Sequence, residues 1–221
     1  MAQAQGKTSE KIRKPKKPTA KGLWKQMSAF EREAQAAGYQ LVCGIDEAGR
    51  GPLAGPVVAA ACLLDPEHPV FGVNDSKQLT PDKREELFGQ ITETAICYGI
   101  GLIEPEEIDR INILQATMQA MRLAVQNLSQ RPDLLLIDAI DLKGTGIPVK
   151  PVIKGDTLSV SIAAASILAK VTRDRLMAEM DEIYPGYGFA RHKGYPTPQH
   201  FAALKELGPT PIHRRSFLHD I

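Results

Sequence analysis

Two adjacent acids, Asp46 and Glu47, directly follow an apolar, strand-like segment, and an arginine comes three residues later. A carboxylate at the end of a buried strand is costly to desolvate unless a positive charge compensates it. Clustered carboxylates usually find that compensation in a hard divalent cation. The arginine, Arg50, stands between Gly49 and Gly51, where the backbone can approach a phosphate closely. This pattern predicts metal-dependent chemistry on nucleic acid.

Asp138 repeats the situation of Asp46 at the end of a second apolar segment, residues 134–137. That segment is apolar on both faces, which is typical of a central strand covered on both sides. Either acid taken alone could be a turn residue that caps the following loop. Because both acids end a buried strand, we interpret them as two members of one site at one edge of a sheet.

Glu47 and Asp156 are weaker candidates from their spacing. Adjacent strand residues point to opposite faces, so Asp46 and Glu47 reach one ion only if the strand ends or twists there. Gly49 and Gly51 would permit that change, and the alternative is a solvent-facing Glu47. Asp156 precedes a predicted helix, and its position alone favours a capping role, because acids are common at helix starts.

Three or four carboxylates can hold two divalent ions about 4 Å apart, an arrangement that serves in-line phosphodiester hydrolysis. One ion activates the attacking water, and the other stabilises the leaving oxygen. The sequence supplies enough carboxylates for this chemistry. It contains no histidine and cysteine spacing typical of a zinc site, and neither common type of glycine-rich nucleotide-binding loop.

The 221 residues are enough for one domain with a sizeable core and small appendages. The net charge of +1 conceals an asymmetry: residues 1–21 carry seven Lys or Arg against one acid, and the remainder carries 20 basic and 25 acidic residues. We interpret residues 1–21 as a disordered basic arm, which is also consistent with contact to a polyanion. Residues 22–221 are the predicted folded domain, with a helical C-terminal part from about residue 184.

Cys43, Cys62 and Cys97 each lie in an apolar, strand-like segment without metal-ligand spacing. We predict that they are reduced core residues of a cytoplasmic protein. The N-terminal residues lack the apolar segment of a secretion signal, and the longest apolar run, residues 57–64, is too short to span a bilayer. We therefore expect a protein that does not bind membranes, and we expect a monomer.

Hydrophobic periodicity and turn residues divide the chain into alternating elements. Strands are predicted over residues 39–46, 56–64, 95–103, 134–138 and 149–153. Helices are predicted over residues 23–37, 80–94, 105–110, 112–129, 159–183 and 197–207, before an irregular tail over residues 208–221. Thr80 and Pro81 form a typical helix start, with a threonine cap and a proline in the first turn. This order of elements predicts an α/β fold, a mixed five-stranded sheet flanked by helices.

The motif over residues 44–57, Gly-Ile-Asp-Glu-Ala-Gly-Arg-Gly-Pro-Leu-Ala-Gly-Pro-Val, resembles the opening motif of type 2 ribonuclease H, ribonuclease HII. Five further stretches match this family in the expected order, at residues 74–77, 136–138, 153–156, 162–170 and 192–197. The resemblance covers about residue 39 to the C-terminus and leaves residues 1–21 outside. It implies a ribonuclease H-like fold with a C-terminal helical extension.

The resemblance also implies an endonuclease that hydrolyses the RNA strand of RNA–DNA hybrids and cuts 5′ to ribonucleotides embedded in duplex DNA. Its products would carry 3′-hydroxyl and 5′-phosphate ends, and its role would be to remove ribonucleotides or RNA primers from DNA. Mg²⁺ or Mn²⁺ would be needed, with Asp46, Glu47, Asp138 and Asp156 as the catalytic, metal-binding acids. Glu47 and Asp156 thereby gain support that their spacing does not provide.

Substrate contacts follow from the same resemblance. Residues 49–51 match the family loop that senses the ribonucleotide, where backbone groups can reach a 2′-hydroxyl that DNA lacks. Tyr195 would pack against the sugar at the RNA–DNA junction, with an ordinary half-buried aromatic residue as the alternative. Lys77 would hold a phosphate, with a solvated loop lysine as the alternative. Arg214 and Arg215 could also contact phosphates, on the basis of their charge alone.

Two other hypotheses fit part of the pattern. A non-catalytic nucleic-acid-binding module would use the basic arm and the loops with Arg and Lys, but it leaves the strand-end acids unexplained. A nuclease or strand-transfer enzyme acting on DNA would keep the fold, but residues 49–51 together with Tyr195 favour ribose sensing. Cleavage that requires both a metal and a ribonucleotide would separate the three hypotheses.

Overall fold

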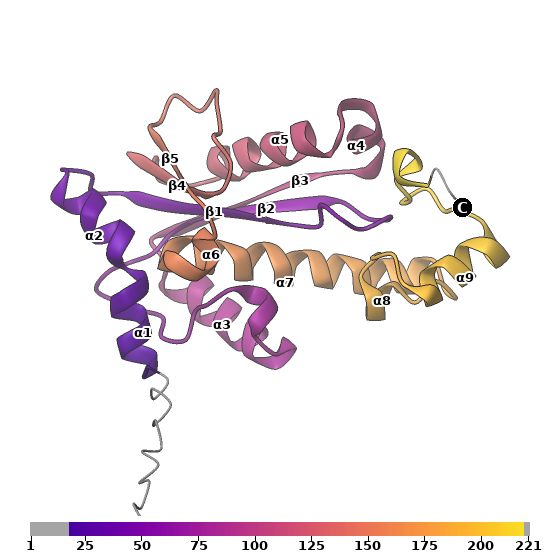
Figure 1. Ribbon diagram of the computed structural model, residues 1–221, viewed down its shortest axis with the longest axis horizontal. Coiled ribbons are helices and arrows are strands. Elements are labelled where there is room, and N and C mark those ends of the chain that lie inside the picture. Colours follow the sequence, from indigo (N-terminus) through magenta and orange to yellow (C-terminus); the bar gives the residue numbers. More distant parts are fainter. Residues whose placement is uncertain (1–17, 219–221) are drawn as a thin grey trace, which may run out of the picture.

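The computed structural model describes residues 18–218, in which five strands form one mixed sheet with helices on both faces (Figure 1). The strands are β1 (Val42–Ala48), β2 (Val57–Leu63), β3 (Cys97–Ile103), β4 (Leu134–Asp138) and β5 (Val149–Val152). Their spatial order is β3-β2-β1-β4-β5. β1 is antiparallel to β2 and parallel to β4, so it joins an antiparallel half of the sheet to a parallel half. The predicted α/β fold is confirmed.

Helices cover both faces and both ends of the sheet. Within residues 18–218 the α-helices are α1 (Ala20–Met27), α2 (Ala29–Ala36), α3 (Pro81–Thr94), α4 (Pro105–Ile111), α5 (Ile113–Gln126), α6 (Gly155–Leu158), α7 (Val160–Ile183), α8 (Phe189–His192) and α9 (Pro198–Leu207). In Figure 1, α4 and α5 lie on one face and α3 and α7 on the other, while α8 and α9 extend past the end of the sheet.

The central strands are buried because helices cover them on both sides. All seven residues of β2 are buried, and Cys43, Cys62 and Cys97 are buried without disulfide bonds, as predicted.

Gly44 in β1 allows α7 to approach the sheet very closely. A methyl group at Gly44 would lie 2.0 Å from the carbonyl carbon of Ser161. This contact fixes α7 against the end of β1.

The helix starts follow the local sequence. Thr80 Oγ1 accepts a hydrogen bond from a backbone N–H of the first turn of α3 at 3.3 Å, and Pro81 is the first helical residue. The predicted helix start at these two residues is confirmed. Ser159 caps α7 in the same way, since its Oγ accepts from a first-turn N–H at 3.2 Å.

The N-terminal helix differs from its prediction. The helix predicted over residues 23–37 is two helices, α1 and α2, which meet at Ser28. Ser28 Oγ donates to the carbonyl of Trp24 at 2.6 Å, and this side-chain bond competes with continuation of the helix. The boundary predicted at residue 21 falls inside α1. Residues 1–17 of the predicted basic arm lie outside the described residues.

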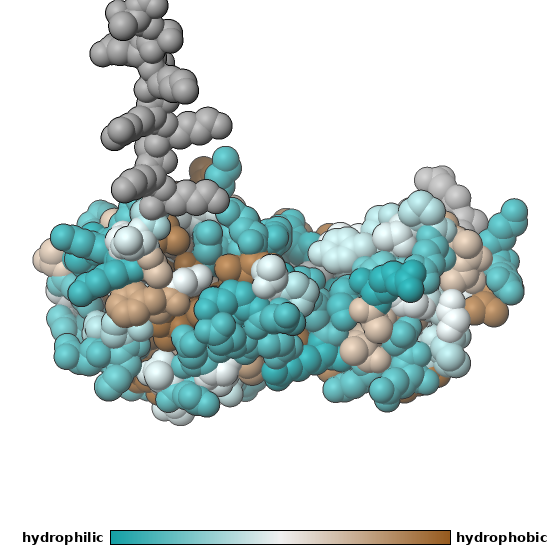
Figure 2. Space-filling view, turned by 90° about the horizontal axis from the view of Figure 1, so that it is seen from below, coloured by the Kyte–Doolittle hydropathy of each residue, from teal (hydrophilic) through white to brown (hydrophobic). Residues whose placement is uncertain are grey.

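Seen from below in Figure 2, a larger lobe that contains the sheet is joined through a waist to a smaller lobe with the C-terminal helices. One apolar cluster connects them. Leu53 and Ala54, from the loop between β1 and β2, pack with Met177 of α7 and with Phe189 and Leu204 of the C-terminal helices. The smaller lobe therefore rests on the loop that carries residues 49–51. No helix within residues 18–218 is long and apolar enough to cross a membrane.

Candidate active site

Asp46 and Asp138 lie side by side at the point where the parallel pairing of β1 with β4 ends. The register pairs Ile45 with Ile137, so the two acids occupy the next position on the same face of the sheet. Asp46 is 5% exposed and its Oδ1 accepts a hydrogen bond from the N–H of Glu47 at 2.8 Å. Asp138 Oδ1 accepts from the N–H of Gly155 at 2.8 Å. The two strand-end acids are thus brought together.

Of the two alternatives predicted for Glu47, an end of the strand or a twist, the first is wrong, because β1 continues to Ala48. β1 stays paired with β2 as far as Ala48, whereas its parallel pairing with β4 ends at Ile45. Only 12% of the Glu47 side chain is exposed, and its carboxylate is close enough to Asp138 and Lys77 for both charges to affect its pKa. Its Oε1 lies 3.3 Å from Nη1 of Arg50. Glu47 is therefore not the fully solvent-facing charge of the alternative interpretation.

Asp156 lies in α6, a single helical turn between β5 and α7, and it is 7% exposed. Its Oδ2 lies 3.7 Å from Nζ of Lys77. The interpretation of Asp156 as the cap of the long helix is wrong, because Ser159 performs that role. The short helix instead brings Asp156 to the edge of the sheet where Asp138 ends β4.

The acids of this edge raise one another's pKa. Burial raises the pKa of Asp46 well above its usual value, and the charges of Glu47 and Asp138 add to the effect. Burial and the charge of Asp138 also raise the pKa of Glu47 and of Asp156. Burial, and to a lesser extent like charge, therefore disfavours the ionised forms of these acids, and a nearby cation would offset both effects.

Lys77 supplies part of that compensation. Partial burial alone would lower the pKa of Lys77, but Asp75, Asp156, Asp46 and Asp138 raise it on balance. Its side chain is 78% exposed, and Nζ is 4.0 Å from Oδ1 of Asp75. This exposed ammonium group lies at the mouth of the acid cluster, so a further positive charge could be accommodated closer to Asp46 and Asp138.

The four acids provide hard oxygen donors that suit Mg²⁺ or Mn²⁺. In residues 18–218, no three carboxylate, histidine or cysteine side chains are already gathered closely enough to hold an ion. The donor chemistry and the raised pKa of buried Asp46 fit a divalent cation, whose charge would relieve the repulsion between the acids.

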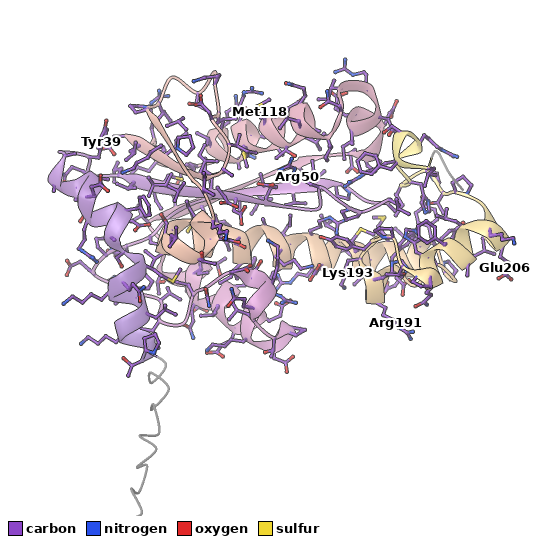
Figure 3. All side chains as sticks on the ribbon, in the orientation of Figure 1. Tyr39, Arg50, Met118, Arg191, Lys193 and Glu206 are labelled. Carbon is purple, nitrogen blue, oxygen red and sulfur yellow. The ribbon has the colours of Figure 1, made fainter. Side chains whose placement is uncertain are left out.

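A cleft of about 430 Å³ opens beside the acids and is bounded by the glycine loop. It is lined by Glu47, Gly49, Arg50, Gly51, Lys77 and Tyr195, together with Ala48, Ser76, Arg84, Ser166 and Lys170. A methyl group placed on Gly51 would lie 3.7 Å from Cε1 of Tyr195, so the loop and the tyrosine are neighbours in the lining of the cleft. In Figure 3, Arg50 projects from the level of the sheet, and Lys193 lies with the C-terminal helices.

Gly49 is required for the shape of the loop. Its φ of +99° is in the region that favours glycine. A methyl group there would lie 2.2 Å from Nε of Arg173 and 2.8 Å from the carbonyl oxygen of Pro56. Both the conformation and the close packing therefore exclude larger residues at this position.

The prediction that Arg214 contacts phosphate is contradicted by its burial. Arg214 is 0% exposed, and its guanidinium donates to backbone carbonyls of the loop between β1 and β2. Arg215 is exposed, and its backbone N–H donates to Oδ2 of Asp109 at 2.7 Å. Two neighbouring arginines thus have opposite environments, which their shared basic stretch does not reveal.

The sequence does not reveal the contacts of two serines, Ser76 and Ser166, or of a second buried arginine. The hydroxyl of Ser166 in α7 opposes part of the rise in the pKa of Asp46. Ser166 Oγ also donates to Oγ of Ser76 at 2.8 Å. The small-residue run of residues 163–166 predicts only close packing against the sheet. Arg173 is 1% exposed and also binds the loop between β1 and β2.

The family model for ribonuclease HII matches residues 43–219. The chain belongs to the ribonuclease HII family. The ribonuclease HII of Acetivibrio thermocellus is 54% identical over 213 residues, which cover 96% of this chain and 83% of that protein. The ribonuclease H2 of Pyrococcus horikoshii has a TM-score of 0.67 at 32% identity, covering 80% of this chain and 93% of that one.

A second solved structure is a complex of PCNA with the ribonuclease HII of Archaeoglobus fulgidus. Its TM-score is 0.68 at 27% identity, with 80% of this chain and 93% of that chain covered. These likenesses confirm the ribonuclease H-like fold. Membership of the ribonuclease HII family identifies the chain as a nuclease, and the family implies cleavage of the RNA strand in RNA–DNA hybrids.

Proposed function

We propose that this ribonuclease HII is a metal-dependent endonuclease that also cuts 5′ to ribonucleotides embedded in duplex DNA. The observation that carries the proposal is the pair of strand-end carboxylates, Asp46 and Asp138, beside the loop of residues 49–51. Products with 3′-hydroxyl and 5′-phosphate ends belong to the proposal. So does a role in removing ribonucleotides or RNA primers from DNA, performed by a monomer in the cytoplasm.

Enzymes of the ribonuclease H family are metal-dependent. Asp46, Glu47, Asp138 and Asp156 are the residues that would hold two Mg²⁺ or Mn²⁺ ions, since they bring only hard oxygen donors. When bound, the ions lower the pKa of water and neutralise charge on the reacting phosphate. The raised pKa values of Asp46, Glu47 and Asp156 support this assignment, because burial and the charges of neighbouring acids disfavour their ionised forms and a bound cation would favour them.

The chain's own groups position the substrate around these acids. Lys77 carries an exposed ammonium at the mouth of the acid cluster, where it attracts a phosphate of the substrate strand. Gly51 and Tyr195 lie next to each other in the lining of the cleft, so a sugar that enters the cleft can contact both the bare backbone of Gly51 and the aromatic ring of Tyr195. Backbone groups there would distinguish a 2′-hydroxyl from hydrogen.

The test is a nicking assay on an end-labelled DNA duplex that carries one ribonucleotide, incubated with Mg²⁺, with Mn²⁺ or with EDTA. The expected result is a metal-dependent nick 5′ to the ribonucleotide and no nick in the all-DNA duplex. Binding without a nick in either metal would support the non-catalytic binding module instead. Cleavage of the all-DNA duplex as fast as of the duplex with one ribonucleotide would favour a DNA nuclease and contradict the proposed ribose sensing.

Asp138→Asn tests the acid set directly. The amide removes one negative charge from the cluster while keeping the size of the side chain, so we expect a loss of cleavage of at least about 100-fold with duplex binding retained. The control is Asp141→Asn, which changes an exposed acid three residues further along that pairs with Lys143. Full activity of Asp138→Asn would contradict the assignment of this residue to the catalytic set.

A further inference from the structure

Arg214 uses its whole guanidinium to bind one loop. Nη2 donates to the carbonyls of Gly49 at 2.6 Å and Gly55 at 2.7 Å, and Nε donates to Gly55 at 2.9 Å. Nη1 donates to the carbonyls of Arg50 at 3.1 Å and Pro52 at 2.8 Å. These five bonds match the five N–H donors of an arginine side chain. The carbonyl oxygens replace water around a buried charge.

Arg173 binds the other half of the same loop. It donates to the carbonyls of Ala54 at 3.0 Å and Pro56 at 2.9 Å, and to Lys193 of the smaller lobe at 2.9 Å. Backbone bonds add to this, since the N–H of Leu53 donates to the carbonyl of Gly194 at 2.8 Å. The loop between β1 and β2 is therefore held from the side of the C-terminal part of the chain.

The direction of these carbonyls determines the direction of the amides that follow them. In a trans peptide the N–H points away from the carbonyl. Because the carbonyls of Gly49 and Arg50 point at Arg214, the N–H groups of Arg50 and Gly51 point away from it, on the side of the cleft. Neither N–H donates to any group within residues 18–218. Two successive amides with this orientation make a concave set of donors.

We propose that Arg214 is a positioning residue, which holds residues 49–51 so that the N–H groups of Arg50 and Gly51 are pre-ordered for the substrate. This inference rests on the proposed function of the loop and explains how its backbone keeps one orientation. Pre-ordered donors cost no reorganisation when the substrate reacts. Arg214 itself never touches the nucleic acid, which separates this role from a phosphate contact.

Arg214→Lys and Arg214→Gln test the proposal by steady-state nicking of the duplex with one ribonucleotide. Lysine keeps the charge but loses the planar fork, so a positioning role predicts that both variants lower kcat by about 10- to 100-fold. KM should change less than about threefold, because the phosphate contacts remain. A wild-type kcat in Arg214→Lys, or a loss confined to KM, would overturn the proposal.

Salt dependence distinguishes positioning from phosphate binding. Loss of one phosphate contact reduces the slope of log Kd against log salt concentration by about 0.9. We expect Arg214→Gln to leave this slope unchanged. A reduced slope would instead support a direct contact between Arg214 and a phosphate. Arg131→Lys is the matched control, because Arg131 also donates to a loop carbonyl, that of Gly146 at 2.9 Å, but it precedes the start of β4, at the opposite end of that strand from Asp138. It should retain wild-type kcat.

Loss of stability alone must also be separated from loss of positioning. Leu87→Ala removes a fully buried side chain of α3 outside the site. It should lower the melting temperature while leaving kcat within about twofold. The comparison is made between Leu87→Ala and an Arg214 variant with the same melting temperature. If both variants lost kcat to the same extent, the positioning role would be contradicted.

The wild-type protein offers a test that does not depend on folded variants or on activity. In ¹⁵N relaxation measurements without substrate, the amides of Arg50 and Gly51 should have order parameters close to about 0.85, as rigid as β1. Values below about 0.6 would show a mobile loop and overturn the proposal even if the enzyme cleaves as expected. Rigid amides in a protein that fails to cut ribonucleotides would instead contradict only the proposed function.

Discussion

Gly49 and Gly51 flank the same arginine but have different neighbours. At Gly49 a methyl group would meet Arg173 at 2.2 Å, and the φ of +99° excludes most side chains. At Gly51 the nearest atom would be Tyr195 Cε1 at 3.7 Å, which is an ordinary contact. Gly49 is thus needed for the fold of the loop, whereas Gly51 leaves open a surface that a substrate can approach.

Alanine substitution should separate these two roles. Gly49→Ala should lower the free energy of unfolding by about 2 kcal/mol or more, through strain and overpacking. Gly51→Ala should change it by less than about 0.5 kcal/mol, yet reduce kcat/KM on the ribonucleotide duplex by about tenfold or more, since its methyl group occupies the cleft. Urea unfolding and the nicking assay measure both effects. A fully active Gly51→Ala would exclude close backbone approach at this residue.

Sequence analysis found the residues of the site that carry an explicit chemical pattern and missed those that depend on distant partners. The four acids and the glycine loop stand in recognisable motifs. Arg214 stands in a basic stretch like any solvated arginine, and its carbonyl partners precede it by up to 165 residues. Ser166 resembles one more small residue of a packing helix. Such roles depend on which loop the fold brings alongside, and local sequence does not contain that information.

At the scale of elements, the strands could be predicted well because β2 and β4 are apolar on both faces. The regular part of β1 extends beyond its predicted end at Asp46, because β2 continues to pair with it after β4 has ended. The break at Ser28 was missed, since a single serine does not interrupt hydrophobic periodicity. Alignment of α7 with β1 depends on Gly44, whose role becomes visible only in the packed structure.

Gly44→Ala should therefore destabilise the whole sheet–helix contact. The methyl group would overlap the main chain of α7 near Ser161, so we expect a loss of about 3 kcal/mol or more in the free energy of unfolding. Gly89→Ala is the matched control, because a methyl group at that position of α3 meets nothing within 4 Å. It should stabilise the protein by about 0.5–1 kcal/mol, as expected for Gly to Ala in a helix. Equal stability of the two variants in urea unfolding would contradict the close approach of α7.

At the scale of the whole molecule, the smaller lobe is held together by buried histidines. His213 Nδ1 accepts from the backbone N–H of Thr210 at 2.9 Å, so its Nε2 carries the proton and donates to Nε2 of His200 at 3.0 Å. His200 in turn donates from Nδ1 to the carbonyl of Tyr195 at 3.0 Å. This chain of bonds requires neutral rings, and it ties α9 and the C-terminal tail to the tyrosine of the cleft.

The neutral histidines make the stability of the molecule sensitive to acid. Burial, with a further effect of His200, lowers the pKa of His213 to about 4, and burial also lowers the pKa of His200. In the unfolded chain a histidine titrates near about 6.5. The folded state therefore binds protons less readily than the unfolded state. The contribution of the neutral histidines to the free energy of unfolding is complete above pH of about 6.5 and is lost as the pH falls toward 4. For His213 the loss should reach roughly 2 kcal/mol, less than the full shift would give, because neighbouring solvent screens part of the charge.

Urea unfolding of wild type and His213→Asn between pH 7 and pH 4.5 measures this contribution. Asparagine keeps an acceptor close to the position of Nδ1 and cannot be protonated in this range. The variant should be less stable at pH 7, because the bond to His200 is lost. Its stability should nevertheless fall less steeply with acid, so that the two curves converge as the pH approaches 4.5. The acids of the active site titrate in both proteins, and the difference between the curves isolates the histidine. Parallel curves would mean that His213 is already protonated, or solvated, in the folded molecule.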